Sequence, residues 1–503
     1  MDRGGEGGMR SLRELLAGVG GAEVRGDLSV QVAGLAYDSR RVAPGDLFAT
    51  WQGFEKDGHG FVPEAVSRGA VACLVERRGT VPPQAVEVFV PDSRHALSRV
   101  AANYYGHPTR NLHLVGVTGT KGKTTTTYLC REVLSVLGSV GLIGTVQTII
   151  GGEPRVAPGA HLTTPEAPDL HAAFAEMVQR GDRYCVIEAS SLALARHRVD
   201  DCDFKTAVFT NLAHDHIGGK EHPDAASYRA AKERLFWLLD PAGQAVVNAD
   251  DPAAPYMIRA TKGQVTTYGF QAGAEIRAEA VEIDPNGASF TLVHGQARRL
   301  VRLRLTGRFN VYNALAAYAV GMTVGVDPEA ACAALERVAG VPGRFQVVPS
   351  LLPFSVIVDY AHTPDSLQNV LGTAREFARG RVIAVFGAGG DRDRSKRPQM
   401  GAIAAAAADL VILTSDNPRS EDPEAILADI AAGIARPPSG GLLSIADRRR
   451  AIETAVAEAR EGDVIIIAGK GHETYQIFAD RTIDFDDRKV AAEALLGRSQ
   501  AGA

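Results

Sequence analysis

The pattern of apolar and polar positions predicts a parallel α/β sheet in the middle of the chain. Residues 112–117 form an apolar run typical of a buried strand, and residues 123–137 then repeat apolar side chains at helical spacing. Two more apolar runs, at 184–188 and 206–210, are separated by helical stretches. Strands that alternate with helices form parallel sheets, whose ligands bind at the carboxyl ends of the strands.

A second doubly wound pattern follows a Gly/Pro-rich break at residues 340–345. Four apolar runs there each lead into a polar loop, at 356–358, 382–386, 410–413 and 464–468. Before the break, residues 274–305 alternate between apolar and polar side chains, which predicts antiparallel strands added to the central domain.

The length of 503 residues also indicates about three domains. We therefore predict an α/β protein with a small mixed α/β N-terminal domain over residues 1–105. A central domain over residues 106–340 would contain a P-loop, a parallel sheet and the added antiparallel strands. A C-terminal, Rossmann-like doubly wound domain would occupy residues 341–503.

Composition narrows the function classes. A net charge of −5 without a long basic run argues against nucleic acid as a partner. No apolar run is long enough to span a membrane, and residues 1–8 lack the apolar segment of a signal peptide. We therefore expect a cytoplasmic protein, with Met9 as an alternative start. The scattered cysteines argue against a disulfide framework or a zinc site: Cys73, Cys130, Cys185, Cys202 and Cys332.

The strand, loop and helix over residues 112–137 describe a phosphate-binding loop, because loop N–H groups and the positive end of the helix dipole would point at an anion. Lys123 would reach the terminal phosphates of a nucleotide, and the Thr124 hydroxyl would bind Mg²⁺. The strict motif G-x-x-x-x-G-K-[ST] is not met, because Val117 stands where its first glycine belongs. A Gly/Lys-rich surface turn is the alternative.

Further candidates follow the predicted strands. Glu188 ends one apolar run and His216 follows another, so both should lie near Thr124 at one edge of the sheet. Oxygen ligands suit Mg²⁺, and one imidazole does not exclude it. Considered alone, His216 is more often a structural or surface histidine, and Lys232 on its predicted helix a solvated lysine.

Two polar regions could bind anionic groups. Residues 38–40, Asp-Ser-Arg, either form a capped turn or hold a diphosphate through hydroxyl and guanidinium contacts. The C-terminal loops carry cations that could grip carboxylates in bidentate fashion: Arg392, Arg394, Lys396, Arg397 and Arg419. A dinucleotide-binding loop at Gly387 is disfavoured, because Arg392 replaces the third glycine of G-x-G-x-x-G.

In their order, these motifs resemble the Mur ligase family over essentially the whole chain. The similarity is greatest to the members that use ATP to add a diamino acid to UDP-N-acetylmuramoyl-L-alanyl-D-glutamate. The residues that carry it are 38–40, 118–125, 163–166, 188–191, 210–212, 215–216, 307–313, 343–344, 359–362, 390–397, 416–419 and 469–473.

The resemblance implies where the substrates bind. ATP would contact Gly119, Thr120, Lys121, Gly122, Lys123, Thr124 and Thr125, with Asn313 and Arg344 near its base and phosphates. The uridine diphosphate would lie against Tyr37 and Ser39, and the muramoyl-dipeptide against Thr163, Thr164, Ser190 and Arg198. The implied partners are these small molecules, and we expect a monomer.

The resemblance also implies a catalytic metal site. Lys232 matches a lysine that family members carboxylate to a carbamate, which is an anionic oxygen ligand. An unmodified ammonium at this position would repel Mg²⁺. The implied Mg²⁺ ligands are Thr124, Glu188, His216 and carboxylated Lys232, and the catalytic residues are Lys123, Glu188, His216 and Lys232.

Residues 416–419, Asp-Asn-Pro-Arg, resemble the sequence of members that add meso-diaminopimelate. Arg419 would hold the distal carboxylate that lysine lacks, and Glu473 would accept a hydrogen bond from the distal ammonium. The implied pocket comprises Arg392, Asp416, Asn417, Pro418, Arg419, Gly469 and Glu473. The alternatives are L-lysine or L-ornithine as the added amino acid, a folate polyglutamylating enzyme, or a P-loop NTPase that acts as a switch or binding module.

Two positions depart from the family pattern. Leu192 stands in place of the usual histidine, and Arg196 in place of a common glutamine. We hypothesise that Arg196 adds a second cation, beside Arg198, against a carboxylate or phosphate of the substrate.

Overall fold

The computed structural model describes residues 8–53, 56–155, 162–213 and 221–501. The chain folds as two compact units. The first consists of Met1–Arg277, Val293–Ala297 and Tyr312–Leu335, and the second of Ala278–Leu292, Arg298–Val311 and Glu336–Ala503.

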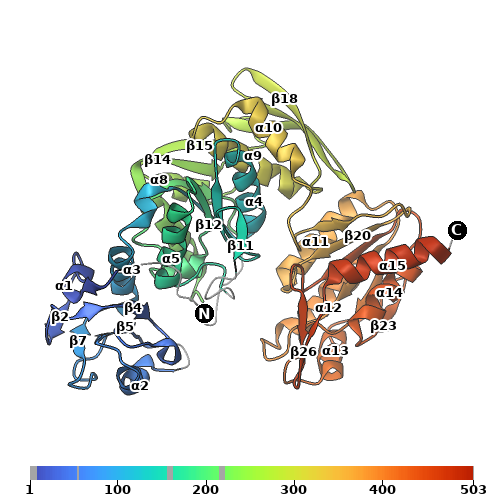
Figure 1. The fold of residues 1–503 in the computed structure, drawn as a ribbon. Helices are drawn as coiled ribbons and strands as arrows, with labels where there is room; N and C mark the ends of the chain where they lie inside the picture. The colour runs from blue at the N-terminus through green and yellow to red at the C-terminus, as the bar shows by residue number, and fades with distance from the viewer. Residues whose placement is uncertain (1–7, 54–55, 156–161, 214–220, 502–503) are drawn as a thin grey trace. The chain divides into compact units, whose positions relative to one another are not determined.

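A five-stranded sheet organises the N-terminal part of the first unit (Figure 1). Its order is β2-β7-β6-β5-β4, with only β2 antiparallel to its neighbour. Leu47 and Ala49 of β5 pack into one core and Phe48 into another, so both faces are covered. The elements are α1 (Leu12–Leu15), β2 (Glu23–Arg25), β4 (Gly34–Ala36), β5 (Asp46–Ala49), α2 (Val62–Ser67), β6 (Ala72–Val75), β7 (Val86–Phe89) and α3 (Ser93–Tyr104).

The central sheet contains eleven strands in the order β11-β10-β9-β12-β8-β13-β14-β15-β16-β17-β18. Strands β9, β12, β8, β13, β14 and β15 are parallel, as the sequence predicts. The strands to this point are β8 (His113–Thr118), β9 (Val140–Ile143), β10 (Thr148–Ile150), β11 (Glu153–Arg155), β12 (Tyr184–Glu188), β13 (Phe204–Phe209), β14 (Leu239–Asn248) and β15 (Gln264–Gly269). The helices are α4 (Lys123–Leu134), α5 (Ala167–Gln179), α6 (Ser191–Ala195), α7 (Ala225–Trp237), α8 (Ala254–Ala260), α9 (Arg308–Thr323) and α10 (Pro328–Arg337).

The strands predicted over residues 274–305 are β16 (Ile276–Asp284), β17 (Gly287–His294) and β18 (Ala297–Leu303). They continue the order of the central sheet beyond β15. The first two residues of β16 pair in parallel with Tyr268 and Gly269 of β15.

The second unit is built on a six-stranded sheet in the order β19-β20-β24-β21-β22-β23, parallel except for β19. Ala384 and Phe386 of β21 pack into one core, and Ile383 and Val385 into another. Helices cover both faces, which explains why the predicted strands are apolar at every position. The elements are β19 (Gln346–Val348), β20 (Ser355–Asp359), α11 (Pro364–Phe377), β21 (Val382–Phe386), α12 (Lys396–Ala407), β22 (Leu410–Leu413), α13 (Pro423–Ala431), β23 (Leu442–Ser444), α14 (Arg448–Glu458), β24 (Val464–Ala468), β25 (Tyr475–Ile477), β26 (Thr482–Asp484) and α15 (Asp487–Ala501).

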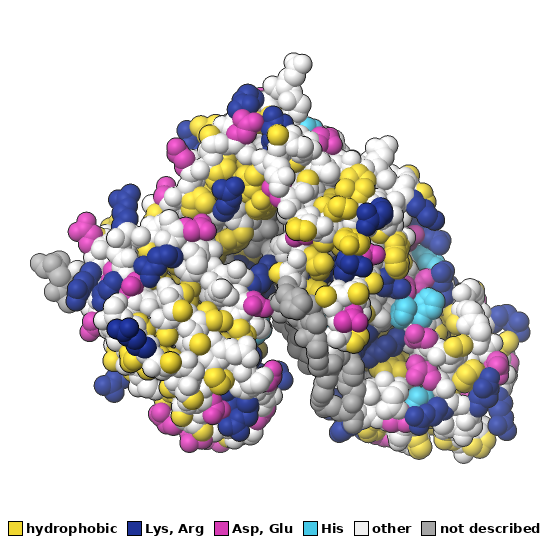
Figure 2. All heavy atoms as spheres, turned by 180° about the vertical axis from the view of Figure 1, so that it is seen from behind, with side chains coloured by type: hydrophobic (Ala, Val, Ile, Leu, Met, Phe, Trp, Pro, Cys, Tyr) yellow, Lys and Arg dark blue, Asp and Glu magenta, His cyan; other side chains and the backbone are white. Residues whose placement is uncertain are grey.

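Charged side chains of both signs are interspersed on the face drawn in Figure 2, in keeping with 54 Lys and Arg against 59 Asp and Glu in the sequence. Among the described residues, no helix is long and apolar enough to cross a membrane. All five cysteines are buried thiols.

An ion pair between α14 and α15 lies inside the second unit. Arg448 Nε and Nη2 each lie 2.7 Å from a carboxylate oxygen of Asp487, and neither side chain reaches solvent. Arg448 also donates to the carbonyl oxygens of Ser415 (3.2 Å) and Ala468 (3.0 Å), which follow β22 and end β24. The pair thus joins two helices to the carboxyl edge of the sheet.

Asp487→Ala should lower the free energy of unfolding by about 3–5 kcal/mol, because it leaves the Arg448 guanidinium buried without its carboxylate. The matched control is Glu493→Ala, which removes the exposed carboxylate paired with Arg449 (2.6 Å) and should cost less than about 1 kcal/mol. Urea unfolding of both variants measures the difference. Equal losses would contradict a stabilising role for the buried pair.

Candidate active site

The loop between β8 and α4 has the backbone shape of an anion-binding loop. Gly122 precedes α4 in a left-handed conformation (φ 83°), and a Cβ atom there would lie 2.6 Å from Asn313 Oδ1. Gly119 has a φ of 152°, and a Cβ atom there would overlap Thr210 Oγ1. Because the first N–H groups of a helix have no acceptor within the helix, this geometry offers them to a ligand.

Thr210 and Asn211, which directly follow β13, form a clasp of hydrogen bonds on this loop. Asn211 accepts a hydrogen bond from Lys121 N–H through Oδ1 (2.9 Å) and donates to Lys121 O through Nδ2 (3.0 Å). The Thr210 hydroxyl also donates to Lys121 O (2.7 Å), and Thr120 N–H donates to Asn211 O (2.9 Å). Residues at the end of a neighbouring strand therefore fix the backbone of this loop from outside it.

The ammonium of Lys123 lies over the same loop. It donates to the carbonyl oxygens of Gly119 (2.9 Å) and Thr120 (3.0 Å). Asn313 on α9 accepts a hydrogen bond from Thr126 of α4 (3.1 Å), which joins these two helices. The predicted phosphate-loop residues and Asn313 thus lie together in the first unit.

Glu188 ends β12, as the sequence predicts, and its side chain is buried. Its carboxylate accepts hydrogen bonds from the N–H (2.8 Å) and the hydroxyl (3.1 Å) of Thr145, a residue that sequence analysis did not identify. Thr145 Oγ1 lies 3.1 Å from Thr163 Oγ1. These contacts link the predicted metal ligand Glu188 to a predicted ligand of the muramoyl-dipeptide.

Lys232 is not the solvated helix lysine that its local sequence favours. It is 1% exposed, and its Nζ lies 4.4 Å from the centre of the Tyr228 ring. The Tyr228 hydroxyl in turn lies 3.0 Å from Thr120 Oγ1, so α7 contacts the phosphate loop. Thr124 is buried at the start of α4, and His216 lies outside the described residues.

A polar group follows β12. Ser190 N–H donates to Thr164 Oγ1 (3.1 Å), and Arg198 Nη1 donates to Thr164 O (2.9 Å). Arg198 Nη2 also pairs with Glu166 (2.8 Å), which Arg94 of α3 approaches at 3.4 Å. The structure therefore brings three predicted dipeptide ligands together and adds Glu166 and Arg94. No local sequence signal identifies Arg94, because its partner is 72 residues away.

Residues 38–40 form a capped turn, one of the two interpretations that the sequence allows. Asp38 accepts a hydrogen bond from Arg40 N–H and pairs with its guanidinium (2.7 Å). Ser39 is buried in this turn, and the neighbouring Tyr37 hydroxyl donates to Asp169 of α5. Burial, followed by the Asp169 charge, raises the pKa of Tyr37.

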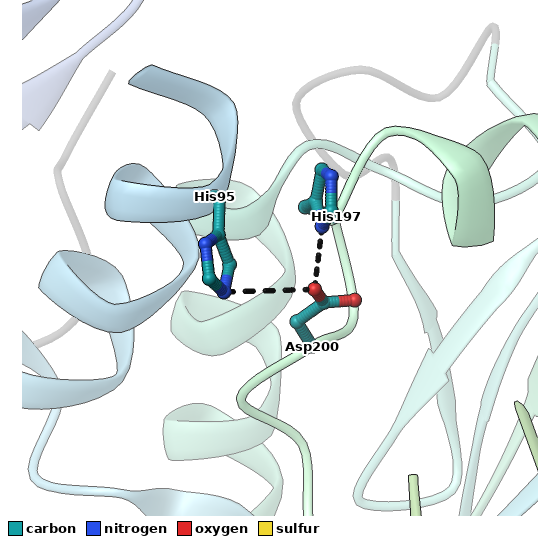
Figure 3. A group of neighbouring side chains, drawn as sticks. All are labelled: His95, His197 and Asp200. Carbon is teal, nitrogen blue, oxygen red and sulfur yellow. Dashed lines mark hydrogen bonds and ion pairs between the residues drawn. The ribbon is translucent and has the colours of Figure 1, made fainter. Parts of the chain in front are cut away.

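His95, His197 and Asp200 form a group that the sequence did not indicate (Figure 3). One possible ligand atom from each lies within 4.8 Å of the others. Arg234 Nη2, however, donates to Asp200 Oδ2 (2.7 Å) and lies 3.1 Å from His197 Nδ1, and this cation disfavours a metal ion. Asp200 Oδ2 lies 2.6 Å from His197 Nδ1 and thereby fixes the turn after α6.

In the second unit, the loops after β22 and β24 meet in a buried polar group. Asn417 Nδ2 donates to Glu473 Oε2 (2.9 Å), and Lys470 Nζ donates to Glu473 Oε2 (2.9 Å) and Asn417 Oδ1 (3.1 Å). Asp416 accepts a hydrogen bond from Asn417 N–H (2.7 Å), and its other oxygen faces Gly469. Lys470 fixes the Glu473 carboxylate; it lies inside the Gly-Lys-Gly-His-Glu motif, yet sequence analysis gave it no role.

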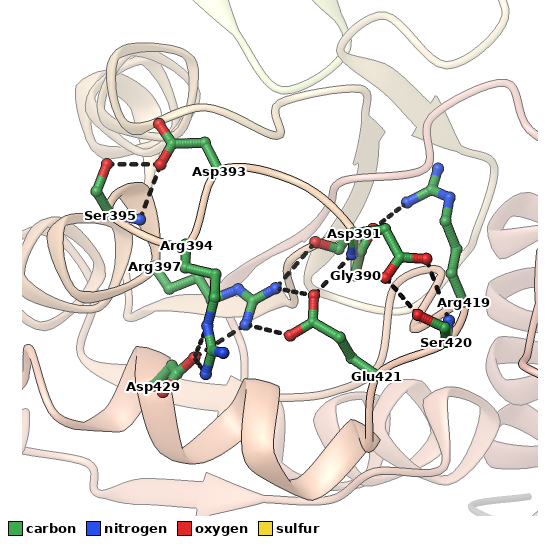
Figure 4. A network of polar contacts seen from close by, with 11 residues as sticks. Gly390, Asp391, Asp393, Arg394, Ser395, Arg397, Arg419, Ser420, Glu421 and Asp429 are labelled. Atoms are coloured by element: carbon green, nitrogen blue, oxygen red, sulfur yellow. Dashed lines mark hydrogen bonds and ion pairs between the residues drawn. The ribbon is translucent and has the colours of Figure 1, made fainter. Parts of the chain in front are cut away.

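The predicted set of ligand-binding cations is wrong for two of its arginines (Figure 4). Arg397 is completely buried and pairs with Glu421 (2.8 Å) and Asp429 (2.9 Å). Arg394 also pairs with Asp429 (3.0 Å). The charges of both arginines are therefore used to anchor the loop after β21 to α13 and the turn before it.

The side chains of Arg419 and Arg392 both lie beside Gly389. A Cβ atom at Gly389 would be 3.0 Å from Arg419 Nη1 and 3.6 Å from Arg392 Cγ. Arg419 Nη1 donates to Gly390 O (2.7 Å), which holds the guanidinium at this loop. Two of the five predicted cations are thus brought together beside the glycine loop.

Arg344 lies in the second unit over the Tyr360 ring (5.0 Å), and this ring packs against His472 (5.0 Å between ring centres). Arg344 Nε and His472 Nδ1 are buried and have no hydrogen-bond partner in the part of the chain that the structure describes. Burial, followed by the Arg344 charge, lowers the pKa of His472 to about 4. The imidazole is therefore neutral at pH 7.

Three family models match the chain. The model described as Mur ligase family, catalytic domain, matches residues 31–105; Mur ligase middle domain matches 117–321; and Mur ligase, glutamate ligase domain, matches 343–471. A UDP-N-acetylmuramoyl-L-alanyl-D-glutamate--2,6-diaminopimelate ligase of Syntrophomonas wolfei is 46% identical over 94% of this chain and 96% of its own. The chain belongs to the Mur ligase family.

Other proteins are similar to this Mur ligase over comparable lengths. A protein of the same name from Gloeobacter violaceus is 47% identical over 98% of this chain and 99% of its own. A solved structure of a ligase with that name covers 98% of this chain and 99% of its own, with 33% identity and a TM-score of 0.68. MurF from Thermotoga maritima, solved with ADP, shares the fold at 19% identity (TM-score 0.61; 93% and 98% covered). The predicted three-domain α/β fold is thereby confirmed.

Gly119→Ala tests the clasp on the phosphate loop of this Mur ligase. The new Cβ atom would push against Thr210 at a strained φ, so we expect ATP affinity to fall roughly 100-fold. Gly273→Ala, at a position with no atom within 4 Å of the added Cβ, is the control and should bind like the wild type. Isothermal titration with ATP measures both, and unchanged affinity in Gly119→Ala would contradict the expectation.

Proposed function

We propose that this Mur ligase joins meso-diaminopimelate to the D-glutamate γ-carboxylate of UDP-N-acetylmuramoyl-L-alanyl-D-glutamate, with cleavage of ATP to ADP and phosphate. The observation that carries the proposal is the similarity to relatives with this name, which are 46% and 47% identical over nearly their full lengths. The reaction supplies a tripeptide precursor for peptidoglycan synthesis.

ATP is assigned to the phosphate loop and its surroundings. Lys123, whose ammonium already lies over the loop, would neutralise charge on the transferred phosphoryl group. The N–H groups of the loop and of the first turn of α4 would bind the phosphate oxygens. The assigned ligands of ATP are Gly119, Thr120, Lys121, Gly122, Lys123, Thr124, Thr125, Asn313 and Arg344.

Mg²⁺ fits the chemistry of the buried donors. Thr124 and Glu188 supply a hydroxyl and a carboxylate, both oxygen ligands of the kind that Mg²⁺ prefers. Lys232 is buried, and conversion of its ammonium to a carbamate would replace a repelling cation by an anionic oxygen. We assign the ion to Thr124, Glu188, His216 and carboxylated Lys232. When bound, it would neutralise negative charge on the phosphates.

The reaction proceeds in two steps. The substrate's γ-carboxylate oxygen attacks the γ-phosphorus of ATP, the bond to the β-phosphate oxygen breaks, and ADP leaves with an acyl phosphate formed. The amine of diaminopimelate then attacks the acyl carbon, inorganic phosphate leaves, and the amine loses a proton as the amide forms. Lys123 serves the first step by holding the phosphoryl oxygens in place.

The amino acid is assigned to the loops after β21, β22 and β24 of the second unit. Arg419 and Arg392, beside Gly389, would bind the distal carboxylate of diaminopimelate. Glu473, held by Lys470 and Asn417, would accept from the distal ammonium. L-Lysine or L-ornithine would leave the two guanidinium groups without the carboxylate that they bind, and would therefore bind less tightly. Asp416, Asn417, Pro418 and Gly469 complete the assigned pocket.

Phosphate release from ATP tests the activity. With UDP-N-acetylmuramoyl-L-alanyl-D-glutamate present, we expect release with meso-diaminopimelate and at least roughly 100-fold less with L-lysine or L-ornithine. A preference for lysine or ornithine would overturn the amino-acid assignment and keep the ligase. Equal release with no acceptor would instead indicate a P-loop NTPase switch.

Arg419→Met should raise the KM for meso-diaminopimelate roughly 10- to 100-fold, because one guanidinium–carboxylate contact is lost. Arg481→Met is the matched control, since Arg481 is an exposed arginine of the same unit paired with Asp480 (3.0 Å). The measurement is the KM for each substrate in turn. An unchanged KM for diaminopimelate in Arg419→Met would remove Arg419 from the pocket.

A further inference from the structure

Arg94 and Arg198 converge on one carboxylate oxygen in the first unit. Arg94 Nη1 lies 3.4 Å from Glu166 Oε1, and Arg198 Nη2 lies 2.8 Å from the same atom. The two arginine side chains are 18% and 5% exposed. Arg198 Nε is also buried and has no hydrogen-bond partner among the residues that the structure describes. One oxygen thus serves two largely buried cations.

A third guanidinium, from Arg196, adds to the positive charge. Burial lowers the pKa of Arg94, Glu166 raises it, and the charges of Arg196 and Arg198 lower it further. Burial and Arg198 likewise lower the pKa of Arg196, which Glu166 and Glu221 raise. Arg94 and Arg198 therefore carry two positive charges against the one carboxylate of Glu166, and the charge of Arg196 adds to the positive potential at Arg94. Because buried charges are ordinarily matched by opposite charges, the excess positive charge favours an anionic ligand.

This arginine cluster, Arg94, Arg196 and Arg198, adjoins the residues assigned to the muramoyl-dipeptide. Arg198 Nη1 donates to Thr164 O (2.9 Å), and Thr164 Oγ1 lies 3.2 Å from Ser190 Oγ. An anion held by the cluster would therefore belong to the same substrate.

Aromatic stacking holds Arg94 in place. Its guanidinium carbon lies 4.2 Å from the centre of the Trp51 ring. Trp51 stacks with Tyr37, with 6.5 Å between ring centres and 22° between planes. These three side chains connect the arginine cluster to a residue predicted to contact the uridine diphosphate. A stacked guanidinium has less freedom to lose when it binds a ligand.

The turn that carries the other two arginines is also fixed (Figure 3). His197, between them, has a left-handed backbone (φ 59°), which is uncommon outside glycine. Arg198 N–H donates to Ala193 O (3.0 Å), and the His197 ring lies 2.6 Å from Asp200. These contacts hold Arg196 and Arg198 close together despite their mutual repulsion.

We propose that Arg94 is a substrate-binding residue that, with Arg196 and Arg198, holds an anionic oxygen of UDP-N-acetylmuramoyl-L-alanyl-D-glutamate. The assignment rests on the proposed function and names a residue from the N-terminal sheet region that the sequence motifs do not contain. The anion is a phosphate of the diphosphate or a carboxylate of the D-glutamate. Glu166 positions the guanidinium groups of Arg94 and Arg198. The anionic ligand supplies the further negative charge that one carboxylate does not provide.

Steady-state kinetics of Arg94→Gln test the assignment. We expect the KM for the nucleotide substrate to rise roughly 10- to 100-fold, with kcat and the KM for ATP within about twofold of the wild type. Arg94→Lys, which keeps the charge, should recover part of the loss, and added salt should raise the wild-type KM more steeply than that of Arg94→Gln. The matched control is Arg99→Gln on the same helix, which removes an arginine paired with Asp201 (2.7 Å) and should leave the KM unchanged.

Direct binding measurements distinguish a phosphate from the D-glutamate carboxylate as the bound anion. They also distinguish failure of the Arg94 assignment from failure of the proposed reaction. In titrations of UDP, UDP-N-acetylmuramoyl-L-alanine and the full dipeptide substrate, a loss in Arg94→Gln with all three assigns a phosphate. A loss with the dipeptide substrate alone assigns the D-glutamate carboxylate. An unchanged affinity, or a lower melting temperature with an unchanged KM, overturns the role of Arg94. If the wild type forms no product, the proposed reaction fails, while binding of the dipeptide substrate still decides the role of Arg94.

Discussion

The clasp between the end of β13 and the phosphate loop is the interaction on which the rest of the site depends. A loop that offers its N–H groups to a ligand cannot satisfy them within itself, so it needs support from outside. Asn211 and Thr210 give this support by bonding to Lys121. Because β12, β8 and β13 are adjacent and parallel, the same edge carries Glu188. A shift in register between these strands would therefore displace the loop and the carboxylate together.

The buried arginines of the scaffold and those of the candidate site differ in how their charges are paired. Arg448 is paired through two hydrogen bonds with Asp487, and Arg397 is shared between Glu421 and Asp429, so both have carboxylates of their own. Arg94 and Arg198 instead share one oxygen of Glu166. In the interior an unmatched charge is costly, so the fully paired arginines serve the scaffold, and the sharing of one Glu166 oxygen motivates the substrate-binding role proposed for Arg94.

The strands could be predicted because their signal is local: the apolar runs at 184–188, 382–386, 410–413 and 464–468 coincide with β12, β21, β22 and β24. Pairings between distant side chains could not. Arg397 has the appearance of a ligand cation until the fold brings Glu421 and Asp429 to it. The burial of Lys232 likewise depends on how α7 packs, and its local sequence favours exposure. The role of Lys232 came from the resemblance to a family, whereas the phosphate loop was predicted from its strand, loop and helix pattern.

Lys123 has a consequence for the end of the catalytic cycle. Its ammonium bonds to the carbonyl oxygens of Gly119 and Thr120, so a nucleotide gains only the difference between these bonds and its own. In the proposed reaction, the two carbonyl oxygens would again accept hydrogen bonds from the ammonium when ADP departs. These carbonyl oxygens would therefore compete with the nucleotide phosphates for the Lys123 ammonium, and this competition would weaken the binding of ADP and ATP alike.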